Sequence, residues 1–220
     1  MTVLTRRSLP PHVDLNPPSK KLTVIHHSDF LSYPASLLEQ LEGAVGRIWD
    51  LGKFANGFGE KEYEVISKDY AVAAFTIKRD QSQEKVVFAF LSGASTSQIE
   101  EKNWLMFGKV KGRAERALAH LQPGVVTYSF RLGGILPVSP VPETSLFQRL
   151  VMDKVVLPFL AMTLPQTVIK SDVLGQGMIE AVSRGGSGAI EGWEGKGEPG
   201  DGGVFENEEI KRLAKGQSKI

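Results

Sequence analysis

The 220-residue sequence contains no cysteine, and this absence excludes several kinds of chemistry. Without thiolates the chain has no disulfide, no cysteine-bound zinc or iron–sulfur cluster and no cysteine nucleophile. Its four histidines are scattered, and the adjacent pair His26 and His27 would diverge on a strand, so we expect no metal site. A serine hydrolase is equally unsupported, because the sequence lacks a Gly-x-Ser-x-Gly elbow.

An excess of either charge and a long apolar run are also missing. Lys and Arg total 26 against 25 Asp and Glu, so the formal net charge is +1 and we expect no nucleic-acid partner. No stretch approaches the roughly 20 apolar residues of a membrane helix, and MTVLTRRSLPPH has too short an apolar run for a secretory signal. These features predict one globular domain over residues 1–220, located in the cytoplasm.

Apolar periodicity predicts strands alternating with helices. The expected strands are residues 2–4, 22–25, 47–51, 86–91, 125–130 and 204–207. The expected helices are residues 34–41, 60–79, 104–121, 144–164 with a break at Pro158, 172–183 and 208–214. Residues 185–203 include nine glycines and are expected to form a flexible loop. The alternation favours an α/β fold, a Rossmann-like doubly wound parallel sheet with flanking helices.

Ligands of such sheets bind beyond the carboxyl ends of the strands, which directs attention to the residues there. Arg6 and Arg7 directly follow the first strand and could grip the 2′-phosphate of NADP, or could be a solvated basic pair. Asp29 follows the second strand and could bind adenine or ribose, or could cap the turn before Pro34. Three further places qualify: Leu51-Gly52, Ser92 to Ser95, and Arg131 to Gly134.

The segment FGKVKGRAE, on the helix expected over residues 104–121, is the most informative. Lys111 lies four residues after Phe107 and therefore on the same helix face. A lysine that faces a sheet edge can hold a cofactor ribose and lower the pKa of a neighbouring acid. The alternative is a surface lysine whose stem packs on apolar residues.

Taken in order, the segments VLTRR, YEVISKDYAVAA, FLSGAS, FGKVKGRAERAL and FRLGGILP resemble the atypical short-chain dehydrogenase/reductase superfamily. More narrowly they resemble fungal NAD(P)-binding proteins described as nucleoside-diphosphate-sugar epimerase-like. In that group a serine-bearing strand end precedes a Tyr-x-x-x-Lys helix, whose continuation reads Lys-Gly-x-x-Glu. That last element is intact here from Lys111 to Glu115.

The resemblance implies an NAD(P)-binding, oxidoreductase- or epimerase-like protein that acts on a small molecule of unknown identity. NADP is slightly favoured over NAD, and a homodimer through the helices at 60–79 and 104–121 would match related proteins. Residues 133–164 would form the substrate side. The cofactor residues it implies are Arg6, Arg7, Asp29, Leu51, Gly52 and Lys111, and the catalytic residues are Lys111 and Ser92.

Three departures from the family bear on activity. The chain begins at what resembles the second strand of the fold, so the first strand and its Gly-x-x-Gly-x-x-Gly phosphate cradle are missing. Phe107 occupies the position of the catalytic tyrosine and has no proton to transfer, and Leu132 replaces a proline. Three interpretations stay open: an NAD(P)-dependent enzyme, a non-catalytic Rossmann-type binding module, and a truncated gene product.

Overall fold

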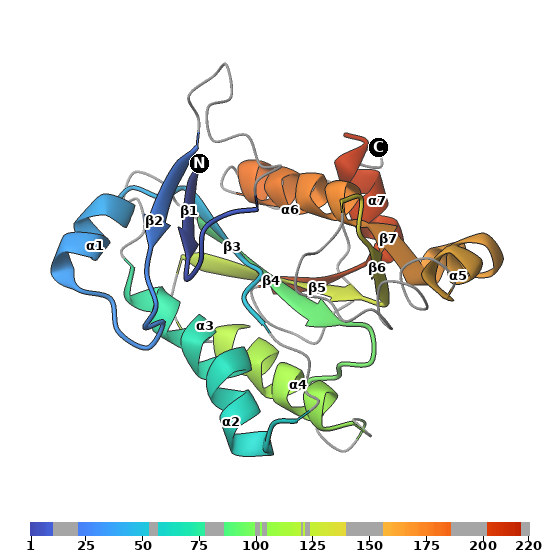
Figure 1. Cartoon of the computed structure of the whole chain (residues 1–220), viewed down its shortest axis with the longest axis horizontal. Coiled ribbons are helices and arrows are strands. Elements are labelled where there is room, and N and C mark those ends of the chain that lie inside the picture. The colour runs from blue at the N-terminus through green and yellow to red at the C-terminus, as the bar shows by residue number, and fades with distance from the viewer. Residues whose placement is uncertain are drawn as a thin grey trace.

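Parallel strands form the centre of the molecule, and helices cover them on both sides (Figure 1). The structure is a computed structural model that describes residues 1–10, 22–52, 57–77, 86–99, 102, 105–119, 121, 124–139, 156–185 and 202–216. The main sheet has four parallel strands in the order β3 (Gly46–Trp49), β4 (Val86–Gly93), β5 (Val125–Leu132) and β8 (Gly202–Glu206). The predicted Rossmann-like α/β fold is confirmed.

A second parallel sheet pairs β1 (Thr2–Thr5) with β2 (Thr23–His26). Within the described residues no backbone ladder joins this sheet to β3, so the β-structure is interrupted between β1 and β3. The two sheets are instead connected by apolar packing. Leu4 and Ile25 lie against a core cluster that contains Phe30 and Trp49. The interruption lies where the doubly wound order would place its first strand.

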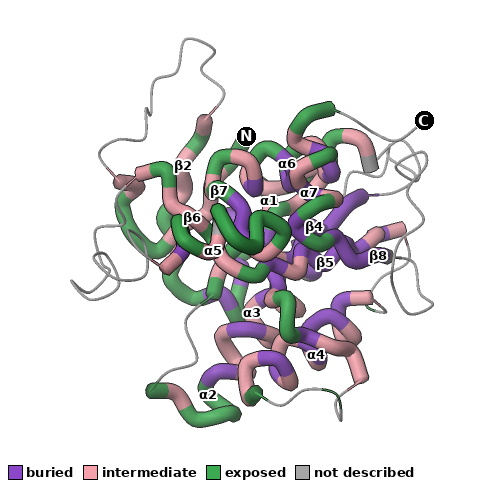
Figure 2. Tube along the Cα trace, turned by 90° about the vertical axis from the view of Figure 1, so that its right-hand side faces the viewer, coloured by how far each residue is buried: buried purple, intermediate pink, exposed green. Residues whose placement is uncertain are grey.

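Strand β4 is apolar throughout because both of its faces are covered. Phe88 and Phe90 belong to one core cluster, whereas Val87 and Ala89 belong to the other. All four side chains are fully buried, and Figure 2 shows burial continuing through β5 and β8. The side-chain alternation of a strand therefore explains why the run VVFAFL lacks any polar residue.

One layer of helices contains α4 (Met106–Ala119) and a continuous helical stretch from residue 60 to 76. That stretch changes its hydrogen-bonding pattern along its length: α2 (Glu60–Glu64), the π-helical η1 (Val65–Asp69), α3 (Tyr70–Ala73) and the 3-10 turn η2 (Ala74–Thr76). The helix predicted over residues 60–79 is therefore less regular and ends earlier than expected. Residues 78–79 lie outside the described part of the chain.

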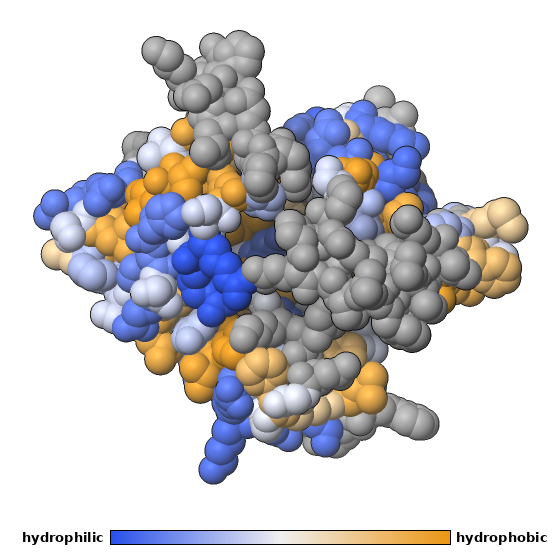
Figure 3. Space-filling view, in the orientation of Figure 1, coloured by the Kyte–Doolittle hydropathy of each residue, from blue (hydrophilic) through white to orange (hydrophobic). Residues whose placement is uncertain are grey.

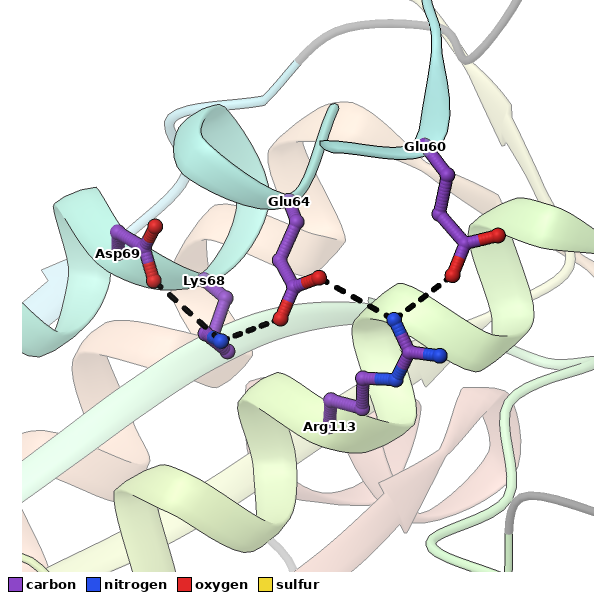
Figure 4. Close-up of polar contacts among 5 residues, drawn as sticks. All are labelled: Glu60, Glu64, Lys68, Asp69 and Arg113. Carbon is purple, nitrogen blue, oxygen red and sulfur yellow. Dashed lines mark hydrogen bonds and ion pairs between the residues drawn. The ribbon is translucent and has the colours of Figure 1, made fainter. Parts of the chain in front are cut away.

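An ion-pair network joins this stretch to α4 (Figure 4). Arg113 Nη1 of α4 donates to Glu60 Oε1 at 2.8 Å and to Glu64 Oε2 at 3.1 Å. Lys68 also binds Glu64, and its Nζ lies 3.4 Å from Asp69 Oδ1. Partly exposed pairs of this kind contribute little each, so their main effect is to fix how α2 and η1 lie on α4.

The opposite layer contains α6 (Ser171–Gly185) and α7 (Asn207–Ala214). The two helices approach closely at Gly177, where an added Cβ would lie 2.7 Å from Ile210 Cγ2 and 2.9 Å from its carbonyl oxygen. A capping box of Glu206 and Glu209 satisfies the first backbone N–H groups of α7. The expected strand at 204–207 is found as β8, the edge strand of the main sheet, but it begins earlier, at Gly202.

The remaining elements are short, and sequence analysis missed two of them. Strands β6 (Gly134–Leu136) and β7 (Val168–Lys170) form a small parallel sheet, where a turn and a connecting segment were expected. The predicted turn after β5 consists of Gly133 alone, because β6 begins at Gly134. A Cβ added to Gly133 would lie 2.2 Å from the Thr167 carbonyl oxygen, so the two segments approach closely there. The other short elements are α1 (Ala35–Leu41), α5 (Leu157–Thr163) and η5 (Pro165–Thr167).

Two further predictions need correction or fall outside the structure. The helix predicted over residues 144–164 with a break at Pro158 is described only from residue 156 onward, where Pro158 stands in the first turn of α5. The glycine-rich loop predicted over residues 185–203 is shorter than expected at both ends. Gly185 is the last residue of α6, and Gly202 and Gly203 are the first residues of β8. Residues 186–201 and 140–155 lie outside the described part of the chain.

Candidate functional site

The carboxyl ends of β3 and β4 place a lysine between them. Lys111 Nζ of α4 donates a hydrogen bond to the Leu91 carbonyl oxygen at 2.9 Å and lies 4.6 Å from the centroid of the Phe90 ring. A Cβ added to Gly52, in the segment after β3, would lie 3.9 Å from the same nitrogen. Helix α4 thus places an ammonium group at the edge of the sheet, which is one of the two placements that the sequence left open for Lys111.

Asp50 is a polar neighbour of Lys111 that sequence analysis did not single out. Trp49 pairs with Phe90 in the β3–β4 ladder, so Asp50 follows at the level of Leu91, the acceptor of Lys111. Burial raises the pKa of Asp50, and the nearby Lys111 charge opposes that shift. Burial lowers the pKa of Lys111 to about 8, and the charges of Asp50 and Glu115 oppose it. The strand expected over residues 47–51 includes Asp50, whereas β3 ends at Trp49 and leaves Asp50 just beyond it.

A buried polar triad lies beneath this edge and links α4 to β4 and β5. Glu115 is 1% exposed and accepts a hydrogen bond from the Ser92 hydroxyl at 2.6 Å. Arg131 donates to both of its carboxylate oxygens, through Nε at 3.2 Å and Nη2 at 2.6 Å. Each buried polar group of the triad therefore has a partner, and the Ser92 hydroxyl is directed to Glu115 in this structure.

Phe107 lies one helical turn before Lys111 and covers the end of β4. A Cβ added to Gly93 would lie 3.0 Å from Phe107 Cε2 and 3.6 Å from Thr96 Oγ1. Thr96 is buried, and no residue in the described part of the chain forms a hydrogen bond with its hydroxyl. The position expected to hold a tyrosine hydroxyl therefore presents an aromatic ring to the strand end.

Leu51 and Gly52, which we expected to line the adenosine side, follow β3 of the main sheet, whereas Arg6, Arg7 and Asp29 lie on the other sheet. Arg6 and Arg7 are exposed in a turn in which Thr5 Oγ1 donates to the Arg7 carbonyl oxygen at 2.9 Å. Asp29 Oδ1 accepts a hydrogen bond from the Leu31 N–H at 3.1 Å, so this carboxylate caps its own turn. The interruption between β1 and β3 separates these three residues from Lys111 and Ser92.

The surroundings of the site include an apolar wall, no cluster of metal ligands among the described residues, and a hollow in the surface. Leu51 packs against the core cluster that contains Phe90, beside Gly52. Within the described residues, no group of three or more His, Asp or Glu side chains could hold a metal ion, and His12 and His120 lie outside them. Figure 3, in the orientation of Figure 1, shows a hollow near the middle of the view, with strongly hydrophilic atoms on one side of it.

No helix of the described chain has the length and apolar character needed to cross a membrane. A comparison with protein-family models finds no match, and a comparison with curated proteins finds none either.

Solved structures do resemble this one. The Bordetella bronchiseptica enzyme WbmG in complex with NAD matches with a TM-score of 0.50 and 12% identity, covering 93% of this chain and 64% of that chain. The same enzyme with NAD and UDP matches with a TM-score of 0.51 and 11% identity, over 97% of this chain and 69% of that one. UDP-N-acetylglucosamine 4-epimerase from Bacillus cereus matches with a TM-score of 0.49 and 15% identity, covering 96% of this chain and 73% of that chain. The chain thus spans about two-thirds of the length of WbmG, and the likeness shows a shared Rossmann-like fold.

Proposed function

We propose that this chain is an NAD(P)-binding, oxidoreductase- or epimerase-like protein that lacks the usual proton donor. The observation that carries the proposal is the Lys111 ammonium group at the carboxyl ends of β3 and β4. Of its three N–H bonds, one is donated to the Leu91 carbonyl. No other described residue accepts from this nitrogen, so two are left to donate to a ligand, and the charge of Asp50 acts on the same group.

This arrangement fits a sugar with neighbouring hydroxyl groups, because an ammonium donates to such hydroxyls and a carboxylate accepts from them. We assign Lys111 and Asp50 to the nicotinamide ribose, and Leu51 and Gly52 to the adjoining wall. Arg6 and Arg7 would pair with the 2′-phosphate of NADP and Asp29 would accept from the adenine. WbmG, crystallised with NAD, supports a nicotinamide cofactor through its similar fold.

The bound cofactor would supply hydride transfer, and the chain would have to move a proton on the substrate. Phe107 cannot do so, since its ring carries no exchangeable proton. The predicted catalytic role of Ser92 requires its hydroxyl to leave Glu115 and turn toward the substrate. We therefore propose binding without efficient turnover, which is the function of a Rossmann-type binding module.

The substrate class, the cytoplasmic location and a homodimer stay predictions. The fold neighbour crystallised with both NAD and UDP favours a nucleotide-linked sugar as the small molecule, on the side of the site formed beyond β5.

Thermal unfolding of the whole chain with NADPH and NADH tests the proposal. A nucleotide at about 100 times its Kd stabilises a protein by roughly 2.7 kcal/mol, which raises the Tm of a chain of this size by about 5–10 °C. Lys111→Met should abolish the shift, whereas Lys109→Met, two residues away on the same helix, should preserve it. Replacing Arg6 and Arg7 with Ala should weaken NADPH binding more than NADH binding. A Tm that neither nucleotide changes would refute the proposal.

A further inference from the structure

The surroundings of Lys111 suit a chemistry that nucleotide binding does not use. Among the described residues its Nζ has a single hydrogen-bond acceptor, a neutral carbonyl, and it lies over the ring of Phe90. It forms no ion pair with any residue that the structure describes. By contrast, Lys68 and Lys211 each bind a glutamate directly. Lys111 therefore lacks the direct carboxylate contact that keeps Lys68 and Lys211 charged, although the charges of Asp50 and Glu115 still oppose the fall in its pKa.

Removal from water disfavours an ammonium and favours the neutral amine, whose lone pair can attack an electrophile. The pKa of about 8 for Lys111 agrees with this effect. At pH 7 its neutral fraction would exceed that of an ordinary surface lysine on the order of a hundredfold.

The neighbouring groups complete a site for a carbonyl compound. The Phe107 ring, which is only partly buried and lies one helical turn before Lys111, provides apolar surface for the carbon part of such a molecule. Asp50 is exposed just after β3, at the level of Leu91, the acceptor of Lys111, and in the proposed reaction its carboxyl gives a proton to the carbonyl oxygen and takes one from nitrogen. A tyrosine at position 107 would have placed a hydroxyl on this surface, whereas phenylalanine leaves it apolar.

We propose that Lys111 forms an imine with an aldehyde or ketone group of a small molecule bound at the carboxyl ends of β3 and β4. The amine nitrogen attacks the carbonyl carbon, and the carbonyl oxygen becomes the hydroxyl of a carbinolamine. Loss of that hydroxyl with the second nitrogen-bound hydrogen releases one water and leaves a carbon–nitrogen double bond. Asp50 transfers the protons between nitrogen and oxygen, and no oxidant or reductant is needed.

Reductive trapping tests this inference on the intact chain. The protein is incubated at pH 7 with benzaldehyde and sodium cyanoborohydride, which reduces an imine to a stable benzylamine. Peptide mass spectrometry then follows the modification of each lysine over time. We expect Lys111 to be benzylated at least about tenfold faster than the exposed Lys61 and Lys102 within the same molecules. Equal rates for the three lysines would overturn the proposal.

Two variants separate reactivity from simple access. The rate at Lys111 should rise with pH to a half-maximum near 8, and Asp50→Asn should move that midpoint to lower pH, because it removes an opposing negative charge. Lys109→Arg should leave the rate at Lys111 unchanged. A midpoint near 10 in the unmodified chain would also overturn the proposal.

The outcome can be told apart from that of nucleotide binding. Rapid labelling of Lys111 that NADPH suppresses would support both proposals, because both use the same amine. Rapid labelling without any NADPH effect on rate or Tm would support the imine and refute nucleotide binding. A rise in Tm with NADPH together with slow labelling of Lys111 would overturn the imine alone.

Discussion

Replacing Glu115 with Ala tests whether the buried triad under the site holds the fold together. Glu115 is fully buried on its side chain, and Arg131 keeps 19% of its side chain exposed. Removing the carboxylate leaves a largely buried guanidinium without this partner. It also removes the acceptor of the Ser92 hydroxyl, a residue that is only 7% exposed. Breaking a buried pair in this way costs about 3–5 kcal/mol.

That cost converts to a large fall in thermal stability. For a chain of this size each kcal/mol lowers the Tm by roughly 2–4 °C, so Glu115→Ala should lower it by about 6–20 °C. Glu180→Ala is the matched control, because Glu180 pairs with Arg184 on the surface of α6 and the loss should stay below about 1 kcal/mol. Urea unfolding at pH 7 gives both free energies.

A double replacement distinguishes loss of a pair from loss of packing. Changing Glu115 and Arg131 together to Met removes both charges and restores apolar volume, so the double variant should recover much of the stability lost by Glu115→Ala. A loss for Glu115→Ala as small as that for Glu180→Ala would refute the reasoning, as would a double variant less stable than the single one.

Three further predictions concern packing, protonation and turnover. Gly177→Ala should destabilise the protein because its Cβ would meet Ile210, whereas Gly175→Ala on the same helix meets nothing within 4 Å and should stabilise it by up to about 1 kcal/mol; urea unfolding compares them. The pKa of Lys111 is lower in the folded chain than its ordinary value of 10.5, so the unfolded chain binds more protons between about pH 8 and 10.5. The stability of the wild type should therefore rise across that window relative to Lys111→Met, and a constant difference would contradict the assignment. Phe107→Tyr restores a proton donor but no glycine-rich phosphate cradle, so neither form should oxidise NADPH with carbonyl substrates, and NADPH oxidation by the unmodified chain would show that the missing hydroxyl is dispensable.

The parts of the fold that the sequence could predict are those governed by local patterns. The uniform apolar run of β4 requires cover on both faces, and the spacing of Phe107 and Lys111 places them on one face of α4. Strands β6 and β7 have three residues each and no recognisable period, so their pairing depends on tertiary contacts such as the approach of Gly133 to Thr167. The π-helical turn η1 likewise arises from packing and not from a residue pattern.

The candidate site shows the same division. Lys111 could be found from the sequence because its helix and the strand end that it faces are both locally encoded. The partners of Glu115 could not, since Ser92 precedes it by 23 residues and Arg131 follows it by 16. Asp50 was missed because the strand expected over residues 47–51 included it, and because its significance depends on a lysine from a different element.

The interruption of the sheet divides the site into halves of different rigidity. Lys111, Ser92 and Glu115 rest on four paired strands with helices on both faces, whereas Arg6, Arg7 and Asp29 rest on a two-stranded sheet, which has little stability by itself. That smaller sheet depends on Leu4 and Ile25 packing against the core near Trp49. A dinucleotide contacting both halves would have to hold them in one arrangement, so its affinity would include the free energy of docking β1 and β2. A carbonyl compound at Lys111 needs the rigid half alone. The same edge of the molecule can therefore react at Lys111 even where it binds a dinucleotide weakly.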